Sequence, residues 1–312
     1  MDIKTTKSKT LVSNIYKRNT IPVLDRVLVK DGMATSTDMD HYVTVPTHLD
    51  NGVYFNEGFK VGLFIEAGED SGDFPNIEEN IKGESLGSVS LDAGKLQALS
   101  WVGRAQSTEE TRYYLNGICF DHDKAVATNG HFLHVVDVNA AIEGRPILPR
   151  KAVSLITSLA KELRANAVTL EFFDCNHYIA HIAGARIYGR TIDGKFPQWE
   201  RVIPENDGRC EIDIGDFIKI RPHVHVIAKI NGQKPKKAAV IIEGGKITVS
   251  GDFHKTGVDW DTTIPLKAGF NINYLCEICS GDAEYGDSSS PLLVRGKDYM
   301  GQIAVLMPVR VF

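Results

Sequence analysis

Three segments of this chain repeat one pattern of strand, tight turn and strand, and this repeat constrains the fold more than any other feature. The segments are VLVKDGMATSTD (27–38), ICFDHDKAVATN (118–129) and VIIEGGKITVSG (240–251), which align without gaps at offsets of 91 and 122 residues. Asp-Gly and Gly-Gly in the first and third segments supply the positive φ angles that a short hairpin turn needs. The repeat predicts a chain built from copies of one structural unit.

A second repeated element follows two of these segments. PRKAVSLITSLAKEL begins at Pro149 and PLKAGFNINYLCEIC begins at Pro265, and in each a proline, any residue, lysine and alanine precede a helical pattern. The apolar face of the first helix consists of Val153, Ile156, Leu159, Ala160 and Leu163. The opposite face carries Arg150, Lys161 and Arg164. We therefore expect α+β units whose helices pack on one side and present positive charge on the other.

Composition changes at two segments rich in glycine, asparagine, proline and acidic residues, 70–87 and 204–209. They predict three domains, 1–87, 88–204 and 205–312. These contain 87, 117 and 108 residues, so the first is shortened. Asn-Gly and Asn-Glu-Gly turns interrupt its residues 47–69, and we expect that it lacks a second helix.

The composition is that of a folded globular chain, with 43% hydrophobic and 24% charged residues. We expect a cytoplasmic protein without membrane contact, because no apolar run is long enough for a membrane helix and the N-terminus resembles no signal peptide. Five cysteines, an odd number, favour free thiols in a reducing compartment. The net charge of −5 means that any nucleic-acid contact has to come from a local basic face.

Motifs for catalysis and metal binding are weak. Residues 184–191 are close to a phosphate-binding loop, but they have arginine in place of the required lysine and no helix follows. Cys276 and Cys279 form a lone Cys-x-x-Cys pair, which is usually structural, and the acidic pairs at the predicted turns are typical of solvated aspartates. We expect no enzyme activity, no cofactor and no metal site.

The middle domain resembles the bacterial DNA polymerase III beta subunit family, the sliding clamps. The matching segments are RYYLNG (112–117), VATNGHFLHV (126–135), ILPRKAV (147–153) and TIDGKFPQWERVIP (191–204). GFNINYL (269–275) and LMPVRV (306–311) resemble the last clamp domain, and IPVL (21–24) and DFPNIEE (73–79) resemble the first. The resemblance implies three repeated α+β clamp-type domains, the first truncated, with helices lining the inside of a ring and antiparallel sheets outside.

Three departures from the family pattern accompany this resemblance. Asn129 and Phe132 stand where the family commonly has aspartate and arginine, next to the Gly-His pair. Pro222 lies within the expected inner helix of the last domain, where a proline kinks or ends a helix. The shortened first domain bears on ring closure, which in the family joins the first domain to the last domain of a second subunit.

The resemblance also implies a groove that binds linear peptides. Its residues in this chain are Leu115, Thr128, Gly130, His131, Leu133, Pro197, Arg201, Val202, Val305, Met307, Pro308 and Arg310. The apolar members would form a pocket, and the two arginines would orient polar or C-terminal groups of an extended peptide. The simpler interpretation is that His131 is structural and that the C-terminal strand only completes a sheet.

The expected DNA contacts are to phosphates, without base readout. The candidates are Tyr113, Tyr114, Arg150, Lys161, Arg164, Lys219, Arg221 and Lys229. Without the resemblance, these cations would be an ordinary solvated helix face and the tyrosines as often core residues as not.

The resulting hypothesis is a DNA sliding clamp, a processivity factor that encircles double-stranded DNA as a head-to-tail homodimer ring. It would bind DNA polymerase and clamp-loader subunits through linear peptide motifs. Residues 58–68 are the expected edge strand for dimer pairing. The alternative is a clamp-derived scaffold or decoy that binds the same peptides without closing a ring.

Overall fold

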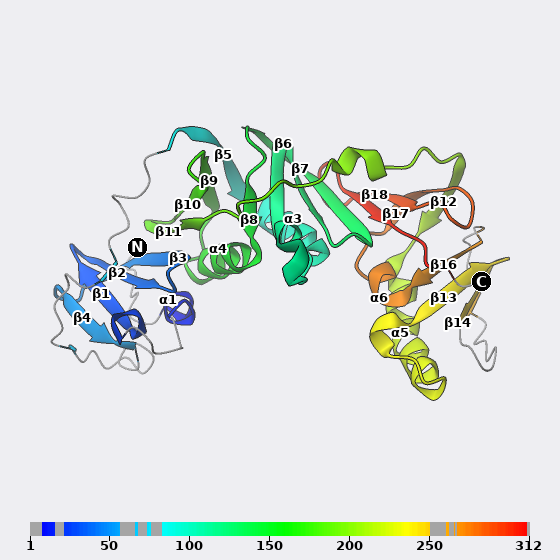
Figure 1. Ribbon diagram of the computed structural model, residues 1–312, viewed down its shortest axis with the longest axis horizontal. Coiled ribbons are helices and arrows are strands. Elements are labelled where there is room, and N and C mark those ends of the chain that lie inside the picture. Colours follow the sequence, from blue (N-terminus) through cyan, green and yellow to red (C-terminus); the bar gives the residue numbers. More distant parts are fainter. Residues whose placement is uncertain are drawn as a thin grey trace. The chain divides into compact units, whose positions relative to one another are not determined.

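The computed structural model describes residues 8–15, 22–56, 66–67, 74–75, 83–249, 260–261, 265 and 267–310. Its chain forms two compact units. Unit 1 comprises residues 1–100, 117–124 and 138–194, and unit 2 comprises 101–116, 125–137 and 195–312. Both contain helices and antiparallel strands, which agrees with the predicted α+β class (Figure 1).

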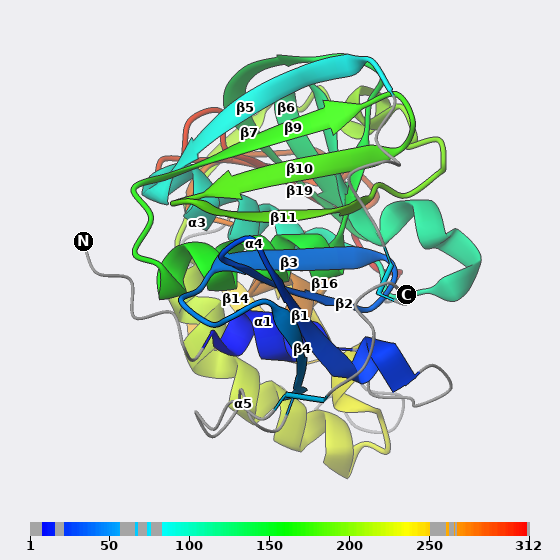
Figure 2. The ribbon, with the colours of Figure 1, turned by 90° about the vertical axis from the view of Figure 1, so that its left-hand side faces the viewer.

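Unit 1 is built on one eight-stranded antiparallel sheet in the order β4-β1-β2-β3-β11-β10-β9-β5 (Figure 2). Its strands are β1 (Arg26–Lys30), β2 (Met33–Thr37), β3 (His41–Pro46), β4 (Gly52–Phe55), β5 (Ser85–Asp92), β9 (Ala167–Phe173), β10 (His177–Ile182) and β11 (Ala185–Arg190). The pairing of β3 with β11, with Val43 opposite Ile187, joins the predicted first and second domains in one sheet. The division at residue 87 therefore does not separate two sheets.

The described helices of unit 1 include α1 (Lys9–Ser13), the 3-10 turn η1 (Pro22–Asp25), most of α3 (Ala93–Val102), and α4 (Arg150–Glu162), which follows the short strand β8 (Ile147–Pro149). Helix α4 confirms the helix predicted after Pro149. Its Val153, Ile156 and Leu159 are buried, whereas Arg150 and Lys161 are exposed.

Helix α4 is tied to the N-terminal part of unit 1 at both ends. At its C-terminal end Glu162 accepts hydrogen bonds from the main-chain N of Lys9 (3.2 Å) and from the N (3.1 Å) and Oγ1 (2.8 Å) of Thr10. At its other end Lys151 donates to Asp38. Burial alone raises the pKa of Asp38, but hydrogen bonds from His41 and Lys151 outweigh it and hold that pKa far below its usual range.

Two long strands, β6 (Gly117–Thr128) and β7 (Phe132–Ile142), are each divided between the units. The predicted hairpin at 118–129 is wrong, because these residues form the single strand β6. A two-residue hairpin turn of this kind needs successive residues with positive φ, and here only His122 has one (53°). The reversal comes later, at Asn129-Gly130. The first and third predicted hairpins are confirmed as β1–β2 and as β13 (Ala239–Glu243) with β14 (Lys246–Val249).

Unit 2 contains two antiparallel sheets. In the first, the strand order is β12 (Gly208–Ile212), β17 (Gly281–Tyr285), β18 (Leu292–Gly296), β19 (Ile303–Leu306) and then β7. In the second the order is β15 (Trp260–Asp261), β14, β13 and β16 (Ala268–Asn271). The 3-10 turns are η4 (Gly103–Ala105), η5 (Glu110–Leu115), η6 (Trp199–Val202) and η7 (Pro235–Lys237).

The helices of unit 2 depart from prediction in two places. The segment after Pro265 was expected to be a helix, but residues Ala268–Asn271 form β16 and the helix α6 is only Ile272–Leu275. Pairing with β13 satisfies the main-chain hydrogen bonds of β16. The short helix α6 then begins after Asn271, whose side chain caps it. Pro222 does not end its helix, since α5 runs from Ile214 to Ile230 through it.

Three predictions cannot be checked in this structure. Most of the predicted edge strand 58–68, most of the boundary 70–87, and much of the stretch 47–69, where we expect no second helix, lie outside the described residues. The division into three domains therefore stays a prediction.

Candidate functional site

The turn between β6 and β7 brings four of the predicted groove positions together in unit 2. Thr128 Oγ1 accepts from Gly130 N (3.0 Å) and donates to Phe132 O (2.7 Å). Asn129 Oδ1 accepts from the main-chain N of His131 (2.9 Å) and of Phe132 (3.1 Å). An asparagine at 129 thus closes the turn as an aspartate could, because the bonds need only a side-chain oxygen.

The left-handed backbone at residue 130 favours glycine, and the Arg112 side chain lies close to this position. The φ of Gly130, 85°, lies in the left-handed region. A Cβ placed on Gly130 would lie 2.6 Å from Nη1 of Arg112, whose guanidinium is held by Glu109 at 2.8 Å. Arg112 is therefore a neighbour of the turn that the sequence analysis did not select.

The C-terminal segment runs directly beside this turn. Strand β19 pairs with β7, with Val305 opposite Leu133, and Met307 N donates to His131 O at 2.9 Å. Val309 N then donates to Gly269 O of β16 at 2.8 Å. The strand does complete a sheet, as the simpler interpretation held, and residues 307–310 continue beyond it with Met307 and Arg310 exposed.

Tyr274 of α6 adds an aromatic contact to the turn. Its ring stacks on His131 with centroids 5.5 Å apart and an interplanar angle of 17°, and it lies 5.1 Å from Phe132. Phe132, which replaces the arginine common in the family, is 3% exposed. The sequence signal for Tyr274 was the GFNINYL segment, whose individual side chains were not assigned.

The predicted apolar pocket divides into buried and exposed members. Leu115, Leu133 and Val305 are between 1% and 3% exposed, so they support the surface from below. Val202 (44%) and Met307 (40%) are exposed, and Pro197 and Arg201 also lie on the surface. The groove assignment stays a prediction.

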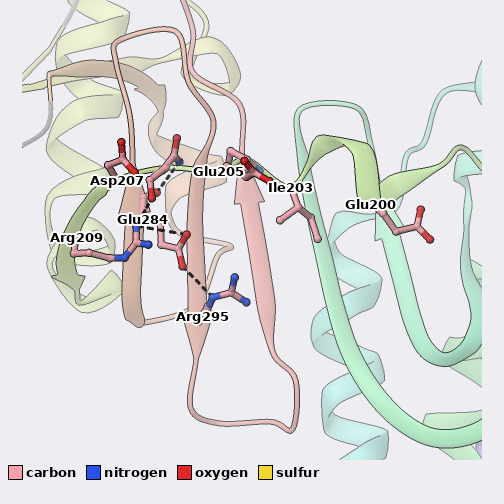
Figure 3. A pocket seen from close by; sticks show the side chains of 9 residues that line it. Glu200, Ile203, Glu205, Asp207, Arg209, Glu284 and Arg295 are labelled. Carbon is pink, nitrogen blue, oxygen red and sulfur yellow. Dashed lines mark hydrogen bonds and ion pairs between the residues drawn. The ribbon is translucent and has the colours of Figure 1, made fainter.

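A depression of about 630 Å³ lies next to η6, and its residues were not predicted. It is lined by Glu200, Ile203, Pro204, Glu205, Asn206, Asp207, Arg209, Glu284 and Arg295. Figure 3 shows Glu284 between two arginines, at 3.6 Å from Arg209 and 3.1 Å from Arg295. These paired charges hold β12, β17 and β18 together, and the depression contains none of the predicted groove residues.

The DNA candidates lie in both units. In unit 1, Arg150, Lys161 and Arg164 are exposed on the polar side of α4 and at its end. In unit 2, Tyr113 is 52% exposed and Tyr114 half-buried in η5, their rings meeting edge to face at 5.8 Å. On α5, Lys219 and Lys229 are exposed and Arg221 is half-buried.

Behind the turn, unit 2 buries a histidine that the sequence analysis did not single out. The His134 ring stacks on Trp101 with centroids 3.8 Å apart, and its Nδ1 donates to Trp101 O at 3.0 Å. Burial lowers the pKa of His134 to about 3, against the opposing effect of that hydrogen bond. The imidazole is therefore neutral at pH 7, with a structural role.

Metal-ligand groups and disulfides are absent from the described part of the chain. No three His, Cys, Asp or Glu side chains among those residues are grouped as metal ligands. All five cysteines are unpaired, and burial raises the pKa of Cys276 to about 11 and of Cys279 to about 12. None of the described helices is long and apolar enough to cross a membrane.

Comparisons with known proteins agree on one family. Residues 96–198 match the model of the DNA polymerase III beta subunit, central domain. The beta sliding clamp of Caulobacter vibrioides is 29% identical over an alignment that covers 96% of this chain and 95% of the clamp, and that of Pseudomonas putida is 26% identical over 76% and 69%. The solved DnaN sliding clamp of Bartonella birtlesii, bound to griselimycin, superposes with a TM-score of 0.79 at 26% identity, over 97% and 96% of the two chains.

Proposed function

Since the chain belongs to the family of bacterial DNA polymerase III beta subunits, the beta sliding clamps, we propose that it is a DNA sliding clamp. Such a clamp is a processivity factor, which encircles duplex DNA and tethers the polymerase to it. The observation that carries the proposal is the likeness in both sequence and fold along nearly the whole chain. The protein would act by binding and would catalyse no reaction itself.

The partner-binding surface that we propose is centred on the β6–β7 turn and the C-terminal segment. Two observations support it: the main-chain bond from Met307 to His131, and the exposure of both side chains, with the half-buried Tyr274 stacked on His131. A rigid turn with an aromatic neighbour and an exposed methionine suits an extended apolar peptide. Such peptides would be segments of DNA polymerase and of clamp-loader subunits.

The proposed DNA contacts are, within unit 1, the exposed basic side of α4 and, within unit 2, Tyr113, Tyr114 and the cations of α5. Contacts to phosphates from few, exposed cations are weak and independent of sequence, which a sliding protein needs. The clamp-derived scaffold remains the second candidate, because the sequence predicts a first domain shortened to 87 residues.

Truncation of Met307 tests the peptide surface. We expect Met307→Ala to weaken binding of a peptide copied from the tail of a bacterial replicative polymerase by about 1–3 kcal/mol, or ~5- to ~150-fold in Kd. Met300→Ala is the matched control, because Met300 is also an exposed methionine of unit 2 (53%) and lies outside the predicted groove. Isothermal calorimetry gives both affinities.

Equal peptide affinity of the two methionine variants and the wild-type protein would contradict the assignment. Leu133→Ala is unsuitable as the decisive variant, because Leu133 is 2% exposed and its truncation costs about 2–5 kcal/mol of stability. Val202→Ala is the better second variant, since 44% of Val202 is exposed.

A further inference from the structure

One stretch of unit 2 has a charge unlike the rest of the chain. Residues 217–242 contain six lysines and arginines and no aspartate or glutamate, in a protein whose net charge is −5. The stretch includes most of α5, the turn η7 and the start of β13. Three of its cations, Lys234, Lys236 and Lys237, belong to none of the sites described above.

The middle of α5 is poorly suited to bind phosphates. Lys219 forms an ion pair with Asp216 at 3.2 Å. The exposed ridge of the helix, at intervals of four residues, contains Ile218 (44% exposed), Pro222, Val226 (57%) and Ile230 (78%). An aliphatic ridge offers a phosphate oxygen neither charge nor hydrogen-bond donors.

Arg221 does not belong to this ridge. It is half-buried, and it lies close enough to Cys276, beyond α6, to oppose the rise that burial causes in the pKa of that thiol. Of the three cations on α5, Lys219 is paired with Asp216 and Arg221 is half-buried. The third, Lys229 near the C-terminal end, is exposed.

The chain then turns back tightly and concentrates charge at that end. Gln233 N donates to Ala228 O at 2.8 Å, and Lys237 N donates to Lys234 O at 2.8 Å. Four exposed lysines lie within nine residues of this tightly turning segment: Lys229, Lys234, Lys236 and Lys237.

Two asparagines of the β16–α6 segment, which lies beside α5 (Figure 1), hold this turn in place. Asn273 Nδ2 donates to Pro235 O (3.0 Å), and Asn271 Nδ2 donates to Lys236 O (3.0 Å). Asn273 Oδ1 in turn accepts from His225 Nε2 of α5 at 2.9 Å. Because the main chain is fixed, a ligand that binds the lysines orders only their side chains.

We propose that the turn Lys234–Lys237, together with Lys229, is the principal phosphate-binding surface of unit 2 for duplex DNA. The inference rests on the proposed clamp function and deepens it, because it moves the contact from the middle of α5 to the end of the helix. Charge complementarity selects the ligand. Four exposed lysines on a fixed main chain, in a stretch without aspartate or glutamate, suit a polyanion with closely spaced phosphates. The aliphatic ridge then contributes no tight contact.

The test uses the full-length protein and a linear duplex of about 30 base pairs, with binding followed by fluorescence anisotropy between ~20 and ~200 mM salt. Each phosphate contact contributes about −0.9 to the log–log slope of affinity against salt. We expect Lys234→Gln/Lys236→Gln/Lys237→Gln to weaken binding at low salt at least tenfold and to make the slope shallower by about 2 to 3. Lys219→Gln/Arg221→Gln should change both quantities much less.

A control variant of equal charge is Lys246→Gln/Lys267→Gln/Lys297→Gln, which removes three exposed lysines from strands and loops of the same unit. Lysines that follow a helix also stabilise its C-terminal end, so the turn variant could unfold at a lower temperature. The melting temperature of each variant is therefore measured, and DNA affinities are compared at a temperature below the unfolding transition of every variant. Affinity that falls equally in the control and in the turn variant would indicate net charge alone and overturn the proposal.

The remaining outcomes separate the two levels of inference. If the wild-type protein binds the duplex and the turn variant binds it with the same affinity and slope, the turn is not the contact, although the clamp function stands. If the larger loss comes from Lys219 and Arg221, the contact lies in the middle of α5 and the proposal is wrong. If the wild-type protein binds no linear duplex at the lowest salt, this inference is wrong, whereas the clamp function is tested separately by retention on circular DNA.

Discussion

His134 is a buried histidine whose protonation opposes folding. Its side chain extends from β7 and is fully buried against Trp101, and burial lowers the pKa of the imidazole from 6.5 to about 3. In the unfolded chain the same histidine takes up a proton below about pH 6.5. Between pH 6.5 and about 3 the unfolded state therefore binds more protons, and stability falls as the pH falls.

This linkage predicts a specific acid sensitivity. Over that window His134 should contribute a loss of up to about 1.4 kcal/mol per pH unit to the free energy of unfolding. In His134→Phe, which keeps a ring against Trp101 but cannot titrate, the dependence should be shallower by that amount. Urea unfolding at several pH values between 7.5 and 4.5 measures it. Parallel curves for the two proteins would exclude the neutral buried imidazole.

The resemblance predicted groove positions one by one, and it could not predict their exposure. Leu115, Leu133 and Val305 have residue types that suit a pocket wall as well as a core, and the pairing of β19 with β7 buries the last two. Arg112 and Tyr274 were missed because they approach the turn from distant parts of the chain. Only three-dimensional packing brings them there.

At the scale of elements, α5 tolerates a proline that local rules exclude. Pro222 cannot donate the main-chain hydrogen bond to residue 218, and its ring crowds the preceding turn. The helix persists because Phe217, Ile220, Val224 and Ala228 are buried on its other side.

Replacement of this proline should stabilise the protein. Pro222→Ala restores the hydrogen bond and removes the crowding, and since Pro222 is exposed, no core packing is lost. We expect a gain of about 1–3 kcal/mol in the free energy of unfolding, visible as a higher Tm in calorimetry. Pro222→Gly, which restores the bond but not the helix propensity, should gain less. A lower Tm for the alanine variant would show that the native helix needs the proline.

Elements were predictable where a local signal was sufficient. The Asp31-Gly32 and Gly244-Gly245 turns have two successive positive φ angles, so their hairpins follow from sequence. Helix α4 follows from its apolar periodicity. The segment 118–129 has no glycine to make a turn. The conformation of residues 268–275 depends on the pairing of β16 with β13, and a local sequence pattern carries no information about such a distant partner.

At the scale of the whole molecule, the charge distribution predicts how DNA is held. The chain is acidic overall, but α4 exposes Arg150, Lys161 and Arg164 on one side. We expect Lys161→Glu/Arg164→Glu to lower the affinity for every duplex alike and to leave peptide binding unchanged. Lys30→Glu/Lys124→Glu, at two strand positions of unit 1, changes the net charge equally and is the control. Anisotropy with duplexes of different sequence compares them.

Two results would contradict this prediction. Equal affinities of the wild-type protein and the α4 variant would show that this side of α4 does not face DNA. A preference above about tenfold for one base sequence would indicate base-specific contacts of about 1–3 kcal/mol each, which would hold a sliding protein at a fixed site.

We expect ring closure to depend on the predicted first domain, part of which belongs to the sheet of unit 1. Strand β4 is at one edge of that sheet, and the outer side of β4 meets Glu66 and Ala67, with a hydrogen bond from Ala67 N to Val53 O of 2.6 Å. The end of the predicted pairing segment 58–68 thus lies at this edge, where an added strand from a second subunit would continue the sheet.

We therefore predict a head-to-tail homodimer of about 69 kDa, twice the chain mass of 34.4 kDa, at micromolar concentration in sedimentation equilibrium. A closed dimer holds DNA by topology, so after loading by a clamp loader it should remain on circular DNA at a salt concentration that abolishes binding to a linear duplex. Cutting the circle should release it, because the ring slides off the ends. A scaffold that does not close a ring would be monomeric at tens of micromolar and would leave circular and linear DNA at the same salt concentration, while it still bound polymerase peptides.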